Sequence, residues 1–234
     1  MTAAAAPVTP IFECQGLVKK FGDLVALDRA DLAVYAGEVL AVVGDNGTGK
    51  TTLIKCLSGA EIPDAGIVRL DGEDMEFRNS NDARRAGVNT VYQSLAVEPA
   101  LDIASSLFRG HELAMPGHIG NVLKWLETKG LRKSPAALAT KVILLDEPTA
   151  ALGERESTQV LRLIESLRGR GLPIIVASHN LRQVLKFADR IHVQRSGRRA
   201  AVVTAQNVTV SDLVGIMSGD LEIGPRDQTL GPAR

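Results

Sequence analysis

Short apolar runs alternate along the chain with segments whose apolar positions recur at helical spacing. Continuous apolar runs are typical of strands that are buried on both faces of a parallel sheet. They predict core strands at 39–43, 88–92, 142–145, 174–177 and 191–193. Helical spacing predicts amphipathic helices over 154–168 and 181–188, and a further helix that opens at Lys50. This alternation predicts an α/β fold with a mostly parallel sheet.

A different pattern marks the first part of the chain. Segments 11–14 and 25–34 alternate between apolar and polar residues, as antiparallel strands do, and 66–70 runs into an Asp-Gly turn. We therefore expect an antiparallel β layer at the edge of the core. Segments 1–10 and 221–234 lack periodicity and are predicted as flexible tails around one domain at 11–220.

Composition limits the possible functions. The chain has 234 residues, which suits one domain, and equal numbers of acidic and basic residues, which disfavours nucleic acid as a partner. Its two cysteines, Cys14 and Cys56, form no metal-binding or disulfide pattern and suit a reducing compartment. The start lacks a signal-peptide pattern, and no apolar run reaches the roughly 18 residues of a membrane span. A link to a membrane would therefore come through a partner.

Residues 44–51 read Gly-Asp-Asn-Gly-Thr-Gly-Lys-Thr, which matches the phosphate-binding loop G-x-x-x-x-G-K-[ST] between a strand and a helix. Glycines let the backbone N–H groups turn inward, and the helix N-terminus adds positive charge. Lys50 would reach the β- and γ-phosphates, and the Thr51 hydroxyl would bind Mg²⁺. ATP and Mg²⁺ are the predicted ligands. The residues expected to bind the nucleotide here are Gly44, Asp45, Asn46, Gly47, Thr48, Gly49, Lys50, Thr51 and Thr52.

An acidic pair, Asp146-Glu147, follows the strand predicted at 142–145. Ligands of open α/β sheets bind at the carboxyl ends of the strands, which is where these two carboxylates would lie. Asp146 is predicted to hold Mg²⁺, directly or through water. Glu147 is predicted to act as the general base that polarises the attacking water.

Two more polar residues follow predicted strands. Gln93 is a candidate contact for Mg²⁺ and the attacking water, and His179 is a candidate hydrogen-bond partner of the γ-phosphate. A lone Gln or His at a strand end is more often structural or exposed. The order along the chain supports them: phosphate loop, Gln93, Asp146-Glu147, then His179. The predicted catalytic residues are thus Glu147, His179 and Gln93, and the predicted metal ligands are Thr51, Gln93 and Asp146.

In this order the motifs resemble the nucleotide-binding subunits of ABC transporters, over about residues 12–219. The resemblance implies a P-loop NTPase cassette and a second cassette as partner. It also implies that Phe21 stacks on adenine, where the alternative is core packing. Residues 149–153 resemble the dimer-contact loop, with Gly153 in place of the more usual Asp.

Finer similarity favours the sugar-importer branch, in particular its ribose, xylose and fructose members. The similar stretches are 44–46, 58–60, 150–153, 178–180 and 211–219. This resemblance implies the energy-coupling subunit of a bacterial importer, peripheral on the cytoplasmic face of the inner membrane, which hydrolyses MgATP. The implied partners are integral-membrane permease subunits and an external sugar-binding protein.

One family element is absent from the sequence. A Leu-Ser-Gly-Gly-Gln segment, which caps the nucleotide of the partner cassette in this family, has no match; Leu57-Ser58-Gly59-Ala60 follows the phosphate loop instead. The helical subdomain, at about 97–140, is therefore expected to be reduced, with the missing piece near 131–135. A natural degenerate subunit, a truncated gene and an incompletely recorded sequence all remain open.

Two alternatives to an importer ATPase follow. A subunit that binds nucleotide with little or no hydrolysis is favoured by the missing segment, whereas Glu147 and His179 favour the enzyme. A soluble ABC ATPase that acts on DNA or ribosomes is disfavoured by the neutral charge and the sugar-importer similarity.

Overall fold

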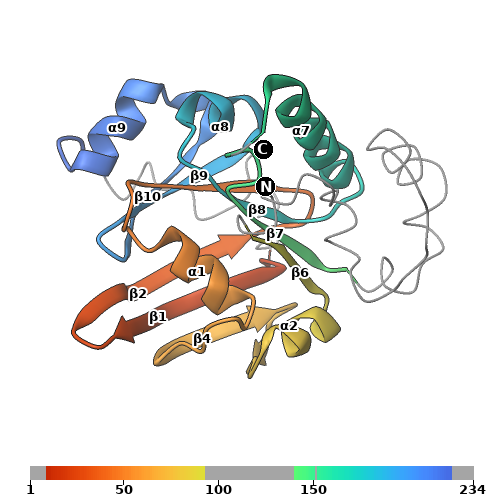
Figure 1. The fold of residues 1–234 in the computed structure, drawn as a ribbon, viewed down its shortest axis with the longest axis vertical. Helices are drawn as coiled ribbons and strands as arrows, with labels where there is room; N and C mark the ends of the chain where they lie inside the picture. The colour runs from red at the N-terminus through yellow and green to blue at the C-terminus, as the bar shows by residue number, and fades with distance from the viewer. Residues whose placement is uncertain (1–8, 93–139, 151, 223–234) are drawn as a thin grey trace, which may run out of the picture.

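The computed structural model describes residues 9–92, 140–150 and 152–222, and contains two sheets with a helix between them (Figure 1). The larger sheet has six strands in the order β10-β9-β3-β8-β7-β6. Its strands are β3 (Val39–Val43), β6 (Val88–Val91), β7 (Val142–Asp146), β8 (Ile174–Ala177), β9 (Arg190–Arg195) and β10 (Arg198–Thr204). All neighbours in this sheet are parallel except the β9–β10 hairpin. The predicted parallel core is confirmed.

The strand β10 was not predicted. It pairs with β9 through a tight turn at Ser196 and Gly197, whose φ angles of 49° and 75° are both positive. Such turns match the twist of the strands that they join, and Gly is favoured in them. The Ser-Gly dipeptide was therefore an available hairpin signal.

The smaller sheet is antiparallel, with the order β2-β1-β4-β5, which confirms the predicted β layer. Its strands are β1 (Phe12–Phe21), β2 (Leu24–Val34), β4 (Ala65–Leu70) and β5 (Glu73–Met75). β1 is longer than the predicted 11–14, because it pairs with β2 on one side and β4 on the other through a bulge near Gly16. Pairing on two sides sustains a strand where its side-chain alternation fades.

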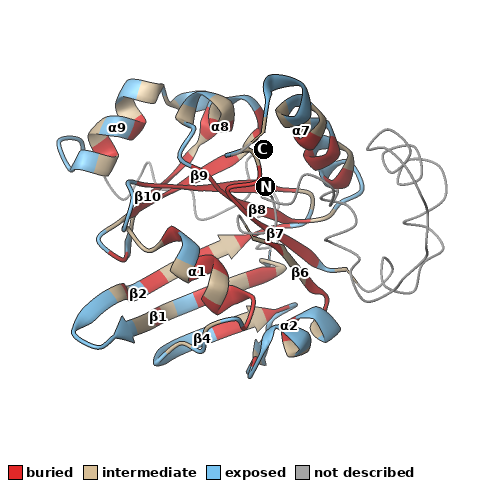
Figure 2. Ribbon diagram, in the orientation of Figure 1, coloured by how far each residue is buried: buried red, intermediate tan, exposed pale blue. Residues whose placement is uncertain are grey.

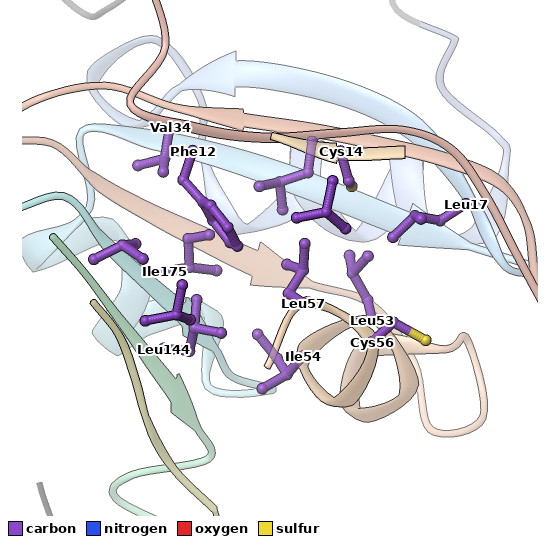
Figure 3. Packing of buried hydrophobic residues seen from close by; sticks show 14 of the residues in the cluster. Phe12, Cys14, Leu17, Val34, Leu53, Ile54, Cys56, Leu57, Leu144 and Ile175 are labelled. Carbon is purple, nitrogen blue, oxygen red and sulfur yellow. The ribbon is translucent and has the colours of Figure 1, made fainter. Parts of the chain in front are cut away.

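The core divides between the two faces of the larger sheet. β3 is buried along its whole length; Leu40 and Val42 face the smaller sheet, whereas Val39, Ala41 and Val43 face the opposite layer. The helix α1 (Lys50–Leu57) lies between the sheets, where Leu53, Ile54 and Leu57 pack near Phe12 and Leu144 (Figure 3). This packing fixes the start of α1 at the carboxyl end of β3.

Three helices cover the other face of the larger sheet, and their buried residues line it (Figures 1 and 2). They are α7 (Glu154–Arg168), α8 (Leu181–Phe187) and α9 (Val210–Ser218). The bounds of α7 agree with the predicted 154–168, and α8 ends one residue before the predicted 188. α9 was not predicted, although Thr209 and Asp212 form a capping box that marks its start.

Two short elements complete the described fold: α2 (Ser80–Ala86) beside β6, and a 3₁₀ turn, η3 (Ala205–Asn207). α2 was also missed, although Asn79 caps it with a side-chain oxygen. Among the described residues, no helix is long and apolar enough to cross a membrane. Gln93 and the predicted helical subdomain at 97–140, apart from residue 140, lie outside the described residues, as do most of the two predicted tails.

Candidate functional site

The loop 44–49 joins the carboxyl end of β3 to the start of α1 and depends on close backbone contacts at two glycines. A Cβ atom at Gly44 would lie 2.3 Å from the Gln194 carbonyl oxygen, and one at Gly49 would lie 2.4 Å from the Ala26 carbonyl oxygen. Gly49 also has a φ of 96°, a left-handed conformation that disfavours side chains. The glycines therefore let the loop curl between β2 and β9.

Lys50, the first residue of α1, extends its side chain back over this loop. Its ammonium Nζ donates to the carbonyl oxygens of Gly44, at 2.7 Å, and Asp45, at 2.9 Å. Burial lowers the pKa of Lys50, while the nearby carboxylates of Glu147 and Asp146 act in the opposite direction. A buried cation inside a curled loop at a helix N-terminus is an arrangement that attracts phosphate.

Asp146 ends β7 and lies against the start of α1. Its Oδ1 accepts a hydrogen bond from the Thr51 hydroxyl at 3.3 Å, and its side chain is buried. Burial raises the pKa of Asp146, and the bond from Thr51 partly offsets that rise. Two oxygen-bearing side chains from distant parts of the sequence are thus brought side by side.

Glu147 has an unusual backbone for a residue with a side chain, with a φ of 51°. Such a conformation costs roughly 1–2 kcal/mol, and a hydrogen bond from its N–H to the Ala177 carbonyl at 2.9 Å helps to hold it. The Oε2 atom of Glu147 lies 2.8 Å from Nδ1 of His179. Backbone strain of this kind concentrates at functional sites, and here it directs a carboxylate toward the histidine.

Both residues are placed by neighbouring parallel strands. Glu147 follows β7, and His179 follows β8 after Ser178, whose N–H donates to the Val42 carbonyl of β3 at 3.0 Å. The imidazole of His179 remains largely exposed, with 60% of its side-chain surface accessible. The histidine can therefore meet a ligand at the carboxyl edge of the sheet while it contacts Glu147.

The remaining predicted residues are more peripheral. Thr48 donates its hydroxyl to the Asp45 carbonyl at 2.8 Å, while the Asp45 and Asn46 residues are exposed and Thr52 is half-buried. Phe21 ends β1 and is 44% exposed, so it is not a core residue. Gln93 lies outside the described residues.

Sequence reasoning missed the support for the phosphate loop. The N–H of Gly197, in the β9–β10 turn, donates to the Thr48 carbonyl at 3.1 Å, and Asp28 donates its N–H to the Gly197 carbonyl at 2.9 Å. Arg198 also forms an ion pair with the Asp28 carboxylate. The Ser-Gly turn was visible in the sequence, but no local pattern indicated that it packs on the loop.

A family model, curated relatives and solved structures were compared with this chain, and their matches agree with one another. A family model described as "ABC transporter" matches residues 27–140. The chain is 43% identical to the fructose import ATP-binding protein FrcA of Rhizobium meliloti, over 91% of this chain and 95% of that protein. It is 35% identical to the ribose import ATP-binding protein RbsA 1 of Rubrobacter xylanophilus, over 90% of this chain and 47% of that protein. The chain therefore spans about half the length of this ribose relative.

Solved structures share the fold at lower identity. A nucleotide-free ATP-binding cassette from an ABC transporter aligns with a TM-score of 0.66 and 22% identity, over 89% of this chain and 98% of that one. A dimeric ATP-binding cassette bound to ADP and phosphate aligns with a TM-score of 0.63 and 21% identity, over 83% and 98%.

The alignment with the fructose relative also shows a difference in length. It extends over 248 positions, more than the 234 residues of this chain. About 35 of those positions (248 less 91% of 234) have no residue here. This chain is therefore internally shorter than that relative.

Proposed function

The chain belongs to the family of ATP-binding proteins of ABC transporters, and from this we propose that it is the energy-coupling subunit of a bacterial importer for a sugar. The family is one of ATP-hydrolysing cassettes, and relatives with 43% and 35% identity are named as import proteins for fructose and ribose. These names support a small sugar as the transported solute.

The observation that carries the proposal is the gathering of five side chains at the carboxyl edge of the larger sheet. Lys50 lies in the curled loop, Asp146 contacts Thr51, and Glu147 contacts His179. In the proposed reaction Lys50 binds the β- and γ-phosphates of ATP. Glu147 accepts a proton from the attacking water, and His179 hydrogen-bonds the γ-phosphate.

The residues present fit Mg²⁺ as the accompanying ion. The Thr51 hydroxyl and the Asp146 carboxylate, 3.3 Å apart, are oxygen ligands of the type that this ion prefers. No group of three or more His, Cys, Asp or Glu side chains is gathered in the described part of the chain. Phosphate and water ligands would therefore complete the coordination, as is usual for Mg²⁺. When bound, the ion neutralises charge that develops on the phosphates.

The cellular location and the partners that we propose follow from the assignment as an importer subunit. The subunit would dock on integral-membrane permease subunits at the cytoplasmic face of the inner membrane and pair with a second ATP-binding cassette. An external sugar-binding protein would deliver the solute. The cassette itself is proposed to occupy residues 11–220, with a reduced helical subdomain at about 97–140.

A second candidate function is nucleotide binding with little or no hydrolysis. It is favoured by the absence of a Leu-Ser-Gly-Gly-Gln segment and by the internal shortening of about 35 positions relative to the fructose protein (248 less 91% of 234). The Glu147–His179 contact favours a function with hydrolysis, since it places the proposed general base beside the histidine proposed to bind the γ-phosphate.

Uptake measurements test the proposal. Cells that lack the gene would be complemented with the wild-type chain, with Lys50→Ala or with Glu147→Gln, and uptake of labelled fructose, ribose and xylose would be followed. We expect one sugar to depend on the wild-type chain and neither variant to restore its uptake. Restoration by Glu147→Gln would favour the non-hydrolytic candidate, and uptake of all three sugars without the gene would overturn the sugar assignment.

A further inference from the structure

Phe21 lies at the tip of the β1–β2 hairpin, and this hairpin approaches the phosphate loop at Gly49. Phe21 pairs with Leu24 across the turn, and two residues after Leu24 the Ala26 carbonyl oxygen approaches the backbone of Gly49. Phe21, Leu24 and Val25 are all exposed, at 44%, 66% and 44%. An apolar tip beside a phosphate loop is placed to receive the base of a nucleotide whose phosphates occupy that loop.

One side of the Phe21 ring already has a partner. The Lys19 ammonium lies over the ring, with 5.3 Å between Nζ and the ring centroid, within the range of a cation–π interaction. Phe21 as a whole is still 44% exposed although a cation covers one side of its ring, so it offers further surface to a ligand. The Lys19 side chain, by contrast, is only 14% accessible.

Lys19 is itself fixed by the segment that follows α1. Its Nζ donates to the Ile62 carbonyl at 2.8 Å and lies 3.7 Å from the Glu61 carboxylate and 4.0 Å from that of Asp64. The same segment holds the strand backbone, because Asp64 accepts from the Lys20 N–H at 2.6 Å. These contacts hold the Lys19 side chain against residues 61–64. This segment follows α1, the helix that begins at the phosphate loop.

We propose that Lys19 is a positioning residue for the nucleotide base: its ammonium, held by the 61–64 segment, orients the Phe21 ring so that the opposite ring face stacks on the base. An exposed aromatic ring on a hairpin tip would otherwise lose rotamer freedom when the base binds. The lysine restricts the Phe21 ring before the base binds. It also links Phe21 to the segment that follows α1, the helix that starts at the phosphate loop. This inference rests on the proposed nucleotide site.

The proposal makes the effect of Lys19 specific to the base. A lysine that only attracted phosphate would affect ATP and inorganic triphosphate equally, since both ligands carry the same phosphate chain. A lysine that orients Phe21 would affect ATP alone. Lys20 provides a matched control, because it is the next residue of β1, carries the same charge and is exposed.

The experiment measures dissociation constants of ATP and inorganic triphosphate, each with Mg²⁺, by isothermal titration calorimetry. The variants are Lys19→Gln, which keeps an amide donor for the Ile62 carbonyl, Lys19→Met, Lys19→Arg, Lys20→Gln and Phe21→Ala. Melting temperatures identify any variant that fails to fold. We expect Lys19→Gln and Lys19→Met to weaken ATP by about threefold to tenfold and to leave triphosphate unchanged. Lys19→Arg should retain the wild-type affinities, and Lys20→Gln should weaken both ligands equally or neither.

A double variant separates the possible failures. If Lys19 acts through the ring, Lys19→Gln combined with Phe21→Ala should bind ATP no more weakly than Phe21→Ala alone. Additive losses, equal losses for both ligands, or wild-type behaviour of the folded Lys19→Gln and Lys19→Met would overturn the role of Lys19. If Phe21→Ala leaves the ratio of the two affinities unchanged, the base contact itself is wrong, and this outcome is distinct from a failure of Lys19.

Discussion

His179 and Glu147 meet through a 2.8 Å contact between Nδ1 and Oε2, although 32 positions separate them in the sequence. The contact engages one imidazole nitrogen and leaves Nε2 available for a phosphate oxygen. It also holds the Glu147 carboxylate near the edge of the sheet, where the strained backbone of this residue already places it. The two side chains are therefore expected to act as one unit.

We predict that Glu147→Gln and His179→Ala each lower the rate of ATP hydrolysis by about 10²- to 10⁴-fold, because a positioned general base contributes that much and the contact with His179 holds Glu147 in position. In the double variant the rate should equal that of the slower single variant, since residues that act as a unit give non-additive losses. Phosphate release would be measured at saturating ATP. Multiplied losses in the double variant would show independent roles.

Lys50→Ala is predicted to weaken ATP binding by tenfold or more. The substitution removes a charge-assisted contact of about 1.5–3 kcal/mol from the phosphate site. Isothermal titration would measure the affinity, with Lys186→Ala as the control, because Lys186 is an exposed residue of α8. Unchanged affinity in Lys50→Ala would contradict the assignment of the loop.

Gly49→Ala should destabilise the protein and impair ATP binding more than Gly47→Ala. Both residues have positive φ angles, of 96° and 80°, which cost an alanine roughly 1–2 kcal/mol each. At Gly49 the new Cβ would also lie 2.4 Å from a backbone oxygen, whereas at Gly47 it meets no atom within 4 Å. Urea denaturation would measure the difference, which we expect to be about 1–3 kcal/mol. Equal losses would show that the loop moves away from β2 at no cost.

The buried His192 predicts a fall in stability on acidification. Burial lowers the pKa of His192 to about 4, while its ordinary value is 6.5. Between pH 6.5 and about 4, His192 is therefore protonated in the unfolded chain but neutral in the folded protein. The free energy of unfolding should drop between pH 6.5 and 4 by up to about 3 kcal/mol from this residue, and stay constant above that window.

Urea denaturation as a function of pH would measure this contribution, with His192→Leu for comparison. The variant removes the titrating group, so its stability should change less between pH 6.5 and 4 than that of the wild type. Parallel pH profiles for the two proteins would show that His192 is not buried in its neutral form.

The absent Leu-Ser-Gly-Gly-Gln segment predicts that ATP does not draw two copies of this chain together. In the family that segment completes the nucleotide site of the partner cassette, and preorganised donors of this kind are worth about 3–4 kcal/mol each. Glu147→Gln would retain ATP but offer no such donors to a second copy. Light scattering with saturating MgATP should therefore find a monomer. A stable ATP-dependent dimer would mean that the donor half exists elsewhere in the chain.

Much of the fold was available from local patterns. The continuous apolar runs predicted β3, β7 and β8 because strands buried on both faces need apolar side chains at every position. The bounds of α7 followed from its helical spacing. α9 and β10 were missed even though a capping box and a Ser-Gly turn marked them, since short amphipathic segments give weak periodicity. The extension of β1 depended on partners on both of its sides, which no local pattern contains.

The candidate site likewise has a part that local sequence predicts and a part that the tertiary fold brings together. The sequence by itself predicted the phosphate loop at 44–51, because its glycines, Lys50 and Thr51 lie within eight consecutive residues, so that one local segment supplies the curled backbone, the ammonium and the hydroxyl. Only the tertiary structure decided that Thr51 contacts Asp146, that Glu147 contacts His179 and that Lys19 lies over Phe21 while bound to the 61–64 segment. Contacts such as Thr51–Asp146 and Glu147–His179 depend on the order of strands in the sheet, and that order follows from packing of the whole core rather than from any local pattern.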